Sequence, residues 1–129
     1  AWNINVDITD YNALKNAFTN VTYCFHLAAE ARLQPAIKNP IEAVYKNCVG
    51  TTTVLQCARE AGVKRVVYSS TSSGYGYNEP PNIETQPDDC LNPYSVSKIA
   101  AETEGCRRTS YYCGRWDSKK RFHLCWRCC

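Results

Sequence analysis

A tyrosine and a lysine four residues apart offer the clearest chemistry in this sequence: Tyr94 and Lys98, within NPYSVSKIAAE. On an α-helix, residues spaced by four lie on the same face, so the phenol and the ammonium would be neighbours. A free phenol ionises near pH ~10, too high for a base at neutral pH, and an ammonium nearby favours the phenolate. The pair could remove a proton from a hydroxyl, although the same spacing also occurs in ordinary exposed helix pairs.

Hydroxyl side chains precede this pair. The apolar run at residues 65–68 has the β-branched and aromatic residues of a buried strand, and Ser69 to Ser73 follow it. Open α/β sheets bind ligands at the carboxyl ends of their strands, so we expect Thr71, Ser72 and Ser73 to face a ligand. One of these hydroxyls could hold a substrate oxygen while it loses its proton.

The helix that carries Tyr94 and Lys98 has a clear beginning. Asn92 is suited to cap it and Pro93 to occupy its first position. Apolar Val96, Ile99 and Ala100 then recur at helical spacing. The sequence therefore predicts a strand, a polar loop and a helix, the elements that must bring the hydroxyls to the phenol.

The segments VVYSSTSSGYG and LNPYSVSKIAAE together resemble the extended short-chain dehydrogenase/reductases, and most closely their nucleotide-sugar 4-epimerases. The resemblance implies a catalytic set of Thr71, four residues before Tyr75, with Tyr94 and Lys98. It also implies that NAD is the cofactor, with Ser69, Tyr94 and Lys98 beside it. Thr71, Ser72 and Ser73 would then contact a nucleotide-sugar substrate.

Residues 4–8 alternate apolar and polar side chains, as a short strand does, and Thr9 or Asp10 can cap a helix that follows. The resemblance implies that Asp7 and Ile8 lie beside the cofactor's adenine. The Asp7 carboxylate would accept a hydrogen bond from the adenine amino group. That Asp7 merely ends a strand is equally compatible with the sequence.

The near-continuous apolar run at residues 21–29 predicts a central parallel strand that is covered on both faces. By resemblance, Leu27, Ala28 and Ala29 at its carboxyl end border the cofactor's phosphates and ribose. His26, within the strand, is expected to be a structural residue. Arg32 could pair with a substrate phosphate, or be an exposed cation.

A long helix is predicted from Asn39 to about Ala61, ending at Gly62. In the family the Asn of an N-x-x-G-T pattern supports the cofactor and the active-site backbone, and here that residue is Asn47. A solvent-facing Asn47 is the alternative. The family commonly forms homodimers through two helices, one of which corresponds to this segment.

Strands and helices alternate through residues 4–104, which predicts an α/β fold, a partial doubly wound parallel sheet of Rossmann type. The glycine-rich turn that receives a dinucleotide pyrophosphate does not occur in the sequence, nor does the family's carboxyl-terminal sugar-binding region. We therefore expect residues 1–104 to be a partial NAD-binding domain that carries the catalytic Thr, Tyr and Lys, and this chain alone to be an inactive fragment.

Residues 105–129 differ in composition from the rest. They carry seven basic residues and one acidic residue, whereas residues 1–104 carry eight and eleven, and they hold five of the nine cysteines. We expect this tail to be unstructured or non-native, as a shifted reading frame would make it. The competing reading is a zinc site built from Cys113, His123, Cys125 and Cys128, although the tail has one C-x-x-C where zinc ribbons use two.

Other features of the sequence argue against a membrane, secreted or nucleic-acid-binding protein. The sequence has no apolar run of membrane-spanning length and no signal-peptide pattern at its start, so we expect a cytoplasmic protein without a membrane partner. The four cysteines before residue 105 are typical of buried thiols in a reducing compartment. Seven cations in the tail without a recognisable module are weak support for nucleic-acid binding.

The favoured reaction is NAD-dependent oxidation and re-reduction at the sugar C4, with Tyr94 as the base. Dehydratases and decarboxylases of the superfamily carry an acidic residue beside the strand-end hydroxyl, where this chain has Ser72 and Ser73. This argues for epimerisation or simple reduction. A non-catalytic domain built on the same fold is the alternative from another class.

Overall fold

One mixed sheet organises the molecule. The computed structural model describes residues 3–83, 85–106, 111–116 and 122–125, with side chains described as far as residue 104. The sheet order is β1-β2-β3-β4, with bounds Tyr23–His26, Arg65–Ser69, Tyr111–Trp116 and Phe122–Cys125. The first three strands run parallel and β4 runs antiparallel to β3. Strands joined through helices into a parallel sheet are the α/β arrangement that the sequence predicts.

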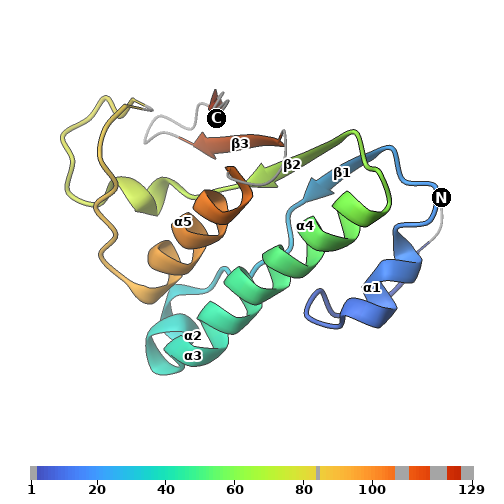
Figure 1. Ribbon diagram of the computed structural model, residues 1–129. Coiled ribbons are helices and arrows are strands. Elements are labelled where there is room, and N and C mark those ends of the chain that lie inside the picture. The colour runs from blue at the N-terminus through green and yellow to red at the C-terminus, as the bar shows by residue number, and fades with distance from the viewer. Residues whose placement is uncertain (1–2, 84, 107–110, 117–121, 126–129) are drawn as a thin grey trace.

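The helices lie on one side of the strands (Figure 1). Helix α4 (Gly50–Glu60) packs against β1, and α5 (Pro93–Cys106) packs against β3. Helix α1 (Tyr11–Ala17) packs in turn against α4, and the Asp10 carboxylate caps it by accepting a hydrogen bond from the Ala13 amide. That cap confirms one of the two residues expected to begin this helix.

The predicted helix from Asn39 to Ala61 is present, with one irregular turn. It consists of α3 (Pro40–Val44), a π-helical turn η1 (Tyr45–Val49) and α4. The Asn39 side chain accepts the Glu42 amide at its beginning, and Gly62 adopts φ +68° just beyond its end. A π turn shifts the residues that face inward and is frequent at functional sites. A short helix that the sequence did not indicate, α2 (Leu33–Lys38), precedes α3.

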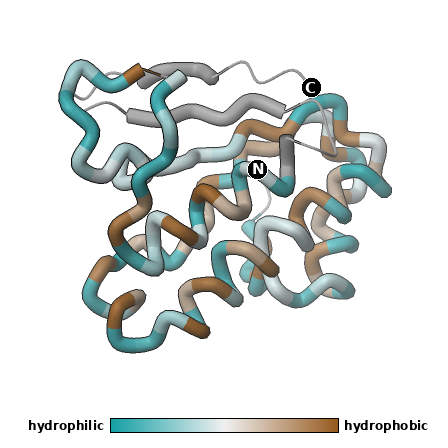
Figure 2. The backbone as a smooth tube through the Cα atoms, turned by 60° about the vertical axis from the view of Figure 1, so that its left-hand side comes forward, coloured by the Kyte–Doolittle hydropathy of each residue, from teal (hydrophilic) through white to brown (hydrophobic). Residues whose placement is uncertain are grey.

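The core lies between β2 and the helices. Its buried members come from α1 and the residue that follows it, and from α4, β2 and α5: Leu14, Phe18, Val54, Leu55, Cys57, Ala58, Val66, Tyr68 and Ala101. Figure 2 shows hydrophobic and hydrophilic stretches alternating along the helices, as expected of amphipathic helices packed on one face. This core fixes α5, which carries Tyr94 and Lys98, relative to β2, which leads into the turn with Thr71.

The predicted strand at residues 4–8 is wrong. Residues 3–7 form no ladder, and residues 8 and 9 form a turn. Of the three apolar residues in the alternation, Val6 and Ile8 pack against the core, whereas Ile4 is exposed. A strand needs a pairing partner as well as a pattern, and within the described residues no strand lies next to this segment.

The prediction that residues 21–29 form a central strand covered on both faces is also wrong. Within the described sheet β1 is an edge strand of four residues. Tyr23, Phe25 and Leu27 are 60%, 71% and 70% exposed, while His26 on the opposite side is buried. The run is apolar on both faces, yet the helices cover only one of them.

The expectation that residues 105–129 are unstructured or non-native stays a prediction. Helix α5 continues to Cys106, and β3 and β4 are strands. The β2–α5–β3 connection places β3 beside β2, where it pairs with backbone groups that would otherwise form an open edge. Tyr111, Tyr112 and Trp116 are aromatic residues that favour strands, a signal present in the sequence. The side chains of Cys113, His123, Cys125 and Cys128 lie outside the described part of the chain.

Candidate functional site

The hydroxyl-rich segment leaves β2 as a tight turn. Ser70 and Thr71 are buried, and Thr71 caps the 3₁₀ turn η2 (Ser72–Tyr75) by accepting the Ser73 amide at 3.1 Å. Ser72 and Ser73 are exposed on that turn. The Thr71 hydroxyl still has its proton to donate, because this bond uses only the oxygen as acceptor.

Helix α5 begins as predicted and packs beside this turn (Figure 1). Asn92 Oδ1 accepts the Ser95 amide at 2.9 Å, and Pro93 occupies the first helical position. Tyr94 is half-buried, whereas Lys98, one helical turn later, is only 2% exposed. The structure therefore places the elements of Thr71, Tyr94 and Lys98 in contact, with the lysine on the inner side of the helix.

Tyr68 supports the buried lysine. The Lys98 ammonium lies 4.1 Å from the centroid of the Tyr68 ring, and the Tyr68 hydroxyl donates to the Lys98 backbone carbonyl at 3.2 Å. The face of an aromatic ring attracts a cation, and more strongly where water is excluded. The sequence pattern did not single out Tyr68, which looked like one more apolar residue of the strand.

One ring nitrogen of His26 is engaged within the fold. Its Nε2 lies 2.9 Å from Thr51 Oγ1, and its ring packs 5.5 Å from the Tyr68 ring. Burial, and then the positive charge of Lys98, lower the pKa of His26 to about 4. The imidazole is therefore neutral at pH 7, which agrees with the structural role expected for it.

Asn47 connects the loop after β1 to α5. It is buried in the π turn, where its Oδ1 accepts the Glu30 amide at 2.8 Å. Its Nδ2 donates to the Glu30 carbonyl at 3.3 Å and to Ser97 Oγ at 2.9 Å. The Ser97 hydroxyl in turn donates to the Tyr94 carbonyl at 2.8 Å. The solvent-facing alternative for Asn47 is therefore wrong, and its amide holds the backbone on two sides of the candidate site.

The other predicted cofactor residues lie around this arrangement. Leu27 and Ala28 are exposed and Ala29 is half-buried, at the carboxyl end of β1, the same sheet edge at which β2 ends with half-buried Ser69. Small alanines at this edge leave the backbone accessible to an extended ligand. Arg32 is exposed at the start of α2, a helix that packs against α5.

Asp7 is already engaged within its own turn. One carboxylate oxygen, Oδ1, accepts the amide of Thr9 at 2.8 Å and its hydroxyl at 2.7 Å. These bonds, the amide's first, lower the pKa of Asp7. Ile8 packs against the core. The second oxygen of the exposed carboxylate is compatible with the predicted contact to an adenine amino group.

Sequence reasoning missed a buried polar pair at the strand end. Ser70 donates to the Glu102 carboxylate at 2.5 Å, and both side chains are buried. Glu102 follows Lys98 by four residues, so it lies on the same helical face. That spacing was the available signal, because a charged residue at an inward position of an amphipathic helix needs a partner.

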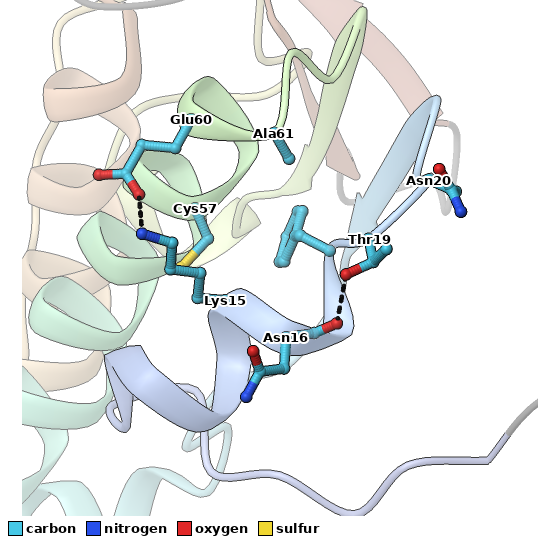
Figure 3. Close-up of a pocket in the computed structure, with 8 residues that line it drawn as sticks. Lys15, Asn16, Thr19, Asn20, Cys57, Glu60 and Ala61 are labelled. Carbon is cyan, nitrogen blue, oxygen red and sulfur yellow. Dashed lines mark hydrogen bonds and ion pairs between the residues drawn. The ribbon is translucent and has the colours of Figure 1, made fainter.

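A pocket between α1 and α4 is separate from these residues (Figure 3). Lys15 and Glu60 form an ion pair there at 3.3 Å, and Tyr11 donates to the same Glu60 oxygen at 2.6 Å. None of the predicted site residues lines it. Its contacts join the two helices and indicate no chemistry.

No metal or membrane element appears in the described part of the chain. Among those residues, no three His, Cys, Asp or Glu side chains cluster as metal ligands would. No helix there has the length and apolar character needed to cross a bilayer.

The fold and the residues at its sheet edge define a Rossmann-like domain of the epimerase/dehydratase kind. The family model described as "NAD dependent epimerase/dehydratase family" matches residues 2–110. The chain belongs to the NAD-dependent epimerase/dehydratase family.

Particular relatives carry related activities in their names. The chain is 37% identical over 100 residues to UDP-glucuronate 4-epimerase from Thermodesulfobacterium geofontis, covering 75% of this chain and 31% of that protein. It is 35% identical over 101 residues to UDP-glucose 4-epimerase from Lacticaseibacillus casei, covering 74% and 30%. It therefore spans about a third of the length of these relatives.

Among solved structures, a dTDP-glucose 4,6-dehydratase from Streptomyces venezuelae, with NAD and TYD bound, has the same fold. It superposes with a TM-score of 0.83 at 30% identity, over 87% of this chain and 37% of that one. The comparisons thus extend to dehydratases as well as epimerases.

Proposed function

We propose that the chain carries the catalytic residues of an NAD-dependent nucleotide-sugar 4-epimerase. The observation that carries the proposal is the placement of Lys98: an almost fully buried ammonium on α5, one turn after Tyr94, in a helix packed against the turn that Thr71 begins. Two relatives named 4-epimerases support this choice within the family.

The residues at the sheet edge fit NAD. The loop after β1 offers the small residues Ala28 and Ala29, and Asn47 holds that loop to α5 through Glu30 and Ser97. Asp7 and Ile8 would lie by the adenine, while Ser69, Tyr94 and Lys98 would face the nicotinamide half. When bound, NAD supplies a reversible hydride acceptor for the sugar C4.

The protein groups would move the proton. Tyr94, as phenolate, takes the proton from the sugar 4-hydroxyl and returns it after the keto-sugar has presented its other face. Thr71 donates a hydrogen bond to the same sugar oxygen, with Ser72 and Ser73 beside it. Lys98 would hold the ribose hydroxyls, with its positive charge one helical turn from Tyr94. Arg32 would pair with a phosphate of the nucleotide.

A dehydratase or reductase of the same family is the second candidate. The dehydratase structure at 30% identity favours it. Ser72 and Ser73 argue against it, because elimination requires an acid beside the strand-end hydroxyl and these exposed residues are not acidic. The burial of Lys98 one helical turn after Tyr94 favours a catalytic role over a non-catalytic member of the fold.

A chimeric enzyme tests the proposal. The segment of the L. casei epimerase that aligns with this chain would be replaced by the aligned segment of this chain. We expect the purified chimera to bind NAD and to interconvert UDP-glucose and UDP-galactose. A folded, NAD-bound chimera that forms only a dehydrated sugar supports the dehydratase instead. A folded, NAD-bound chimera that converts neither UDP-glucose nor UDP-galactose refutes both candidates.

We also propose that the protein is a homodimer formed through its long helix. An apolar groove on the outer side of that helix is lined by Pro40, Ile41, Val44, Tyr45 and Val49. Ile41 is 81% exposed, an unfavourable position for an isoleucine unless another surface covers it. Sedimentation of Ile41→Glu should show a monomer where the unmodified protein is a dimer, whereas Thr52→Glu, exposed on α4, should leave the dimer intact.

We also propose a cytoplasmic location, which the thiols and the proposed substrate class support. Among the described residues, Cys24, Cys48 and Cys57 form no disulfide. They fit a reducing environment such as the cytoplasm, where nucleotide sugars are substrates.

A further inference from the structure

Tyr68 contacts Lys98 at both ends of the lysine. The ammonium lies 4.1 Å from the centroid of the Tyr68 ring, and the Tyr68 hydroxyl donates to the backbone carbonyl of Lys98 at 3.2 Å. Tyr68 is 1% exposed and Lys98 is 2% exposed, so both contacts exclude water. One side chain of β2 therefore fixes both the helix backbone at Lys98 and the position of its charge.

Burial makes the ring contact important. An ammonium removed from water is unfavourable unless other groups compensate for the lost hydration. The face of an aromatic ring provides such compensation, and its attraction for a cation grows as water is excluded. An aliphatic side chain of similar size would fill the same space without attracting the charge.

The tyrosine ring is itself held in place. The His26 ring packs against it with centroids 5.5 Å apart and planes inclined at 41°. The His26 imidazole is fixed by Thr51 on α4 at 2.9 Å. Because the pKa of His26 is lowered to about 4, the imidazole places no second positive charge beside Lys98 at neutral pH.

We propose that Tyr68 is a positioning residue that holds the Lys98 ammonium where it can act on Tyr94. The ring face sets the location of the charge, and the hydroxyl sets the register of α5 against β2. The inference rests on the proposed function, in which Lys98 acts beside the base. It adds a residue from outside the Thr, Tyr and Lys set.

A spectroscopic test needs no activity. A proton above an aromatic ring resonates upfield, so we expect the Lys98 ε-methylene signal of the 129-residue chain to lie upfield of the other lysine signals, assigned by its loss in Lys98→Met. Tyr68→Phe keeps the ring and should keep the shift, whereas Tyr68→Leu should abolish it. A Lys98 signal among those of the exposed lysines, or an upfield signal that survives Tyr68→Leu, overturns the proposal.

The chimeric enzyme gives the functional readout. We expect Tyr68→Leu to lower kcat about tenfold or more, because the ammonium loses its cation–π contact, and Tyr68→Phe to restore most of the rate. Val66→Ala is the matched control, since it removes buried volume from the same strand and keeps the Tyr68 side chain that contacts Lys98. Tyr68→Met, which is longer, replaces Tyr68→Leu if the latter does not fold.

The outcomes separate this inference from the proposed function. Unchanged kcat in Tyr68→Leu, or an equal loss in Val66→Ala, contradicts a positioning role. If the unsubstituted chimera folds and binds NAD but is inactive, the proposed function fails, and the Lys98 chemical shift alone decides whether Tyr68 holds the ammonium.

Discussion

The hydroxyl of Ser70 donates a 2.5 Å hydrogen bond to the carboxylate of Glu102, and both side chains are buried. This bond ties the end of β2 to α5 one turn beyond Lys98. Because Thr71 is the next residue along the chain, the bond also restrains the turn that carries it. The relative placement of the strand-end hydroxyls and the helix thus depends on a buried polar contact as well as on apolar packing.

Removal of this contact should destabilise the protein. We expect Glu102→Ala to lower the free energy of unfolding by about 3 kcal/mol, because Ser70 loses its acceptor and a cavity remains. Glu104→Ala, an exposed position on the same helix, should change it by less than about 0.5 kcal/mol. Urea unfolding measures both. Equal effects of the two substitutions would show that the buried Ser70–Glu102 hydrogen bond does not stabilise the fold.

His26 should make stability depend on pH. Its pKa is about 4 in the folded protein and 6.5 when unperturbed, so below pH 6.5 the unfolded chain binds a proton that the folded chain does not. The stabilisation is complete above pH 6.5 and is lost progressively as the pH falls toward 4. Between pH 6.5 and 5 we expect a loss of about 1.5 kcal/mol that is absent in His26→Gln. If the free energy of unfolding of the unsubstituted protein and of His26→Gln changed equally over this pH interval, a lowered pKa of His26 would be refuted.

Asn47 should control the loop after β1. In Asn47→Ala, Glu30 loses the acceptor of its amide and Ser97 loses a donor. We expect the Glu30 amide to exchange with solvent at least about tenfold faster, the factor that corresponds to about 1.4 kcal/mol. Hydrogen exchange followed by NMR measures this directly. Asn39→Ala, which removes an exposed helix cap, should leave the Glu30 amide unchanged.

Two glycines should tolerate alanine differently. Gly76 has φ +55° and ψ −123°, and a Cβ there would collide with the backbone oxygen of Asp89. Gly62 has φ +68° with open space around it. We expect Gly62→Ala to cost about 1 kcal/mol of stability, the ordinary left-handed penalty, and Gly76→Ala to cost more than about 2 kcal/mol. Thermal unfolding of both variants decides, and a smaller cost at Gly76 would contradict the described turn.

Local signals in the sequence were sufficient for several elements. The caps at Asp10, Asn39 and Asn92 begin helices where expected, because a capping side chain acts within three residues of chain. The apolar run before Ser69 forms β2, and the glycine at position 62 follows the end of the long helix. The N-x-x-G-T pattern correctly indicated a buried, hydrogen-bonded Asn47.

Features that depend on distant partners could not be predicted in this way. The alternation at residues 4–8 carries no information about whether a neighbouring strand exists. The apolar run at 21–29 likewise does not reveal that only one face of β1 is covered. Tyr68 and Glu102 acquire their roles through contacts with Lys98 and Ser70, some 30 residues away in the chain. The roles of Thr71, Tyr94 and Lys98 in catalysis stay predictions.

Tyr94 is proposed to take the proton from the sugar 4-hydroxyl, and single-turnover formation of NADH in the chimeric enzyme tests this role most directly. With UDP-glucose added to the NAD-bound chimera, we predict that Tyr94→Phe slows the appearance of NADH by about 10²- to 10⁴-fold, the usual contribution of a general base. NAD binding should be retained. NADH formation in Tyr94→Phe at the rate of the unsubstituted chimera would contradict the account.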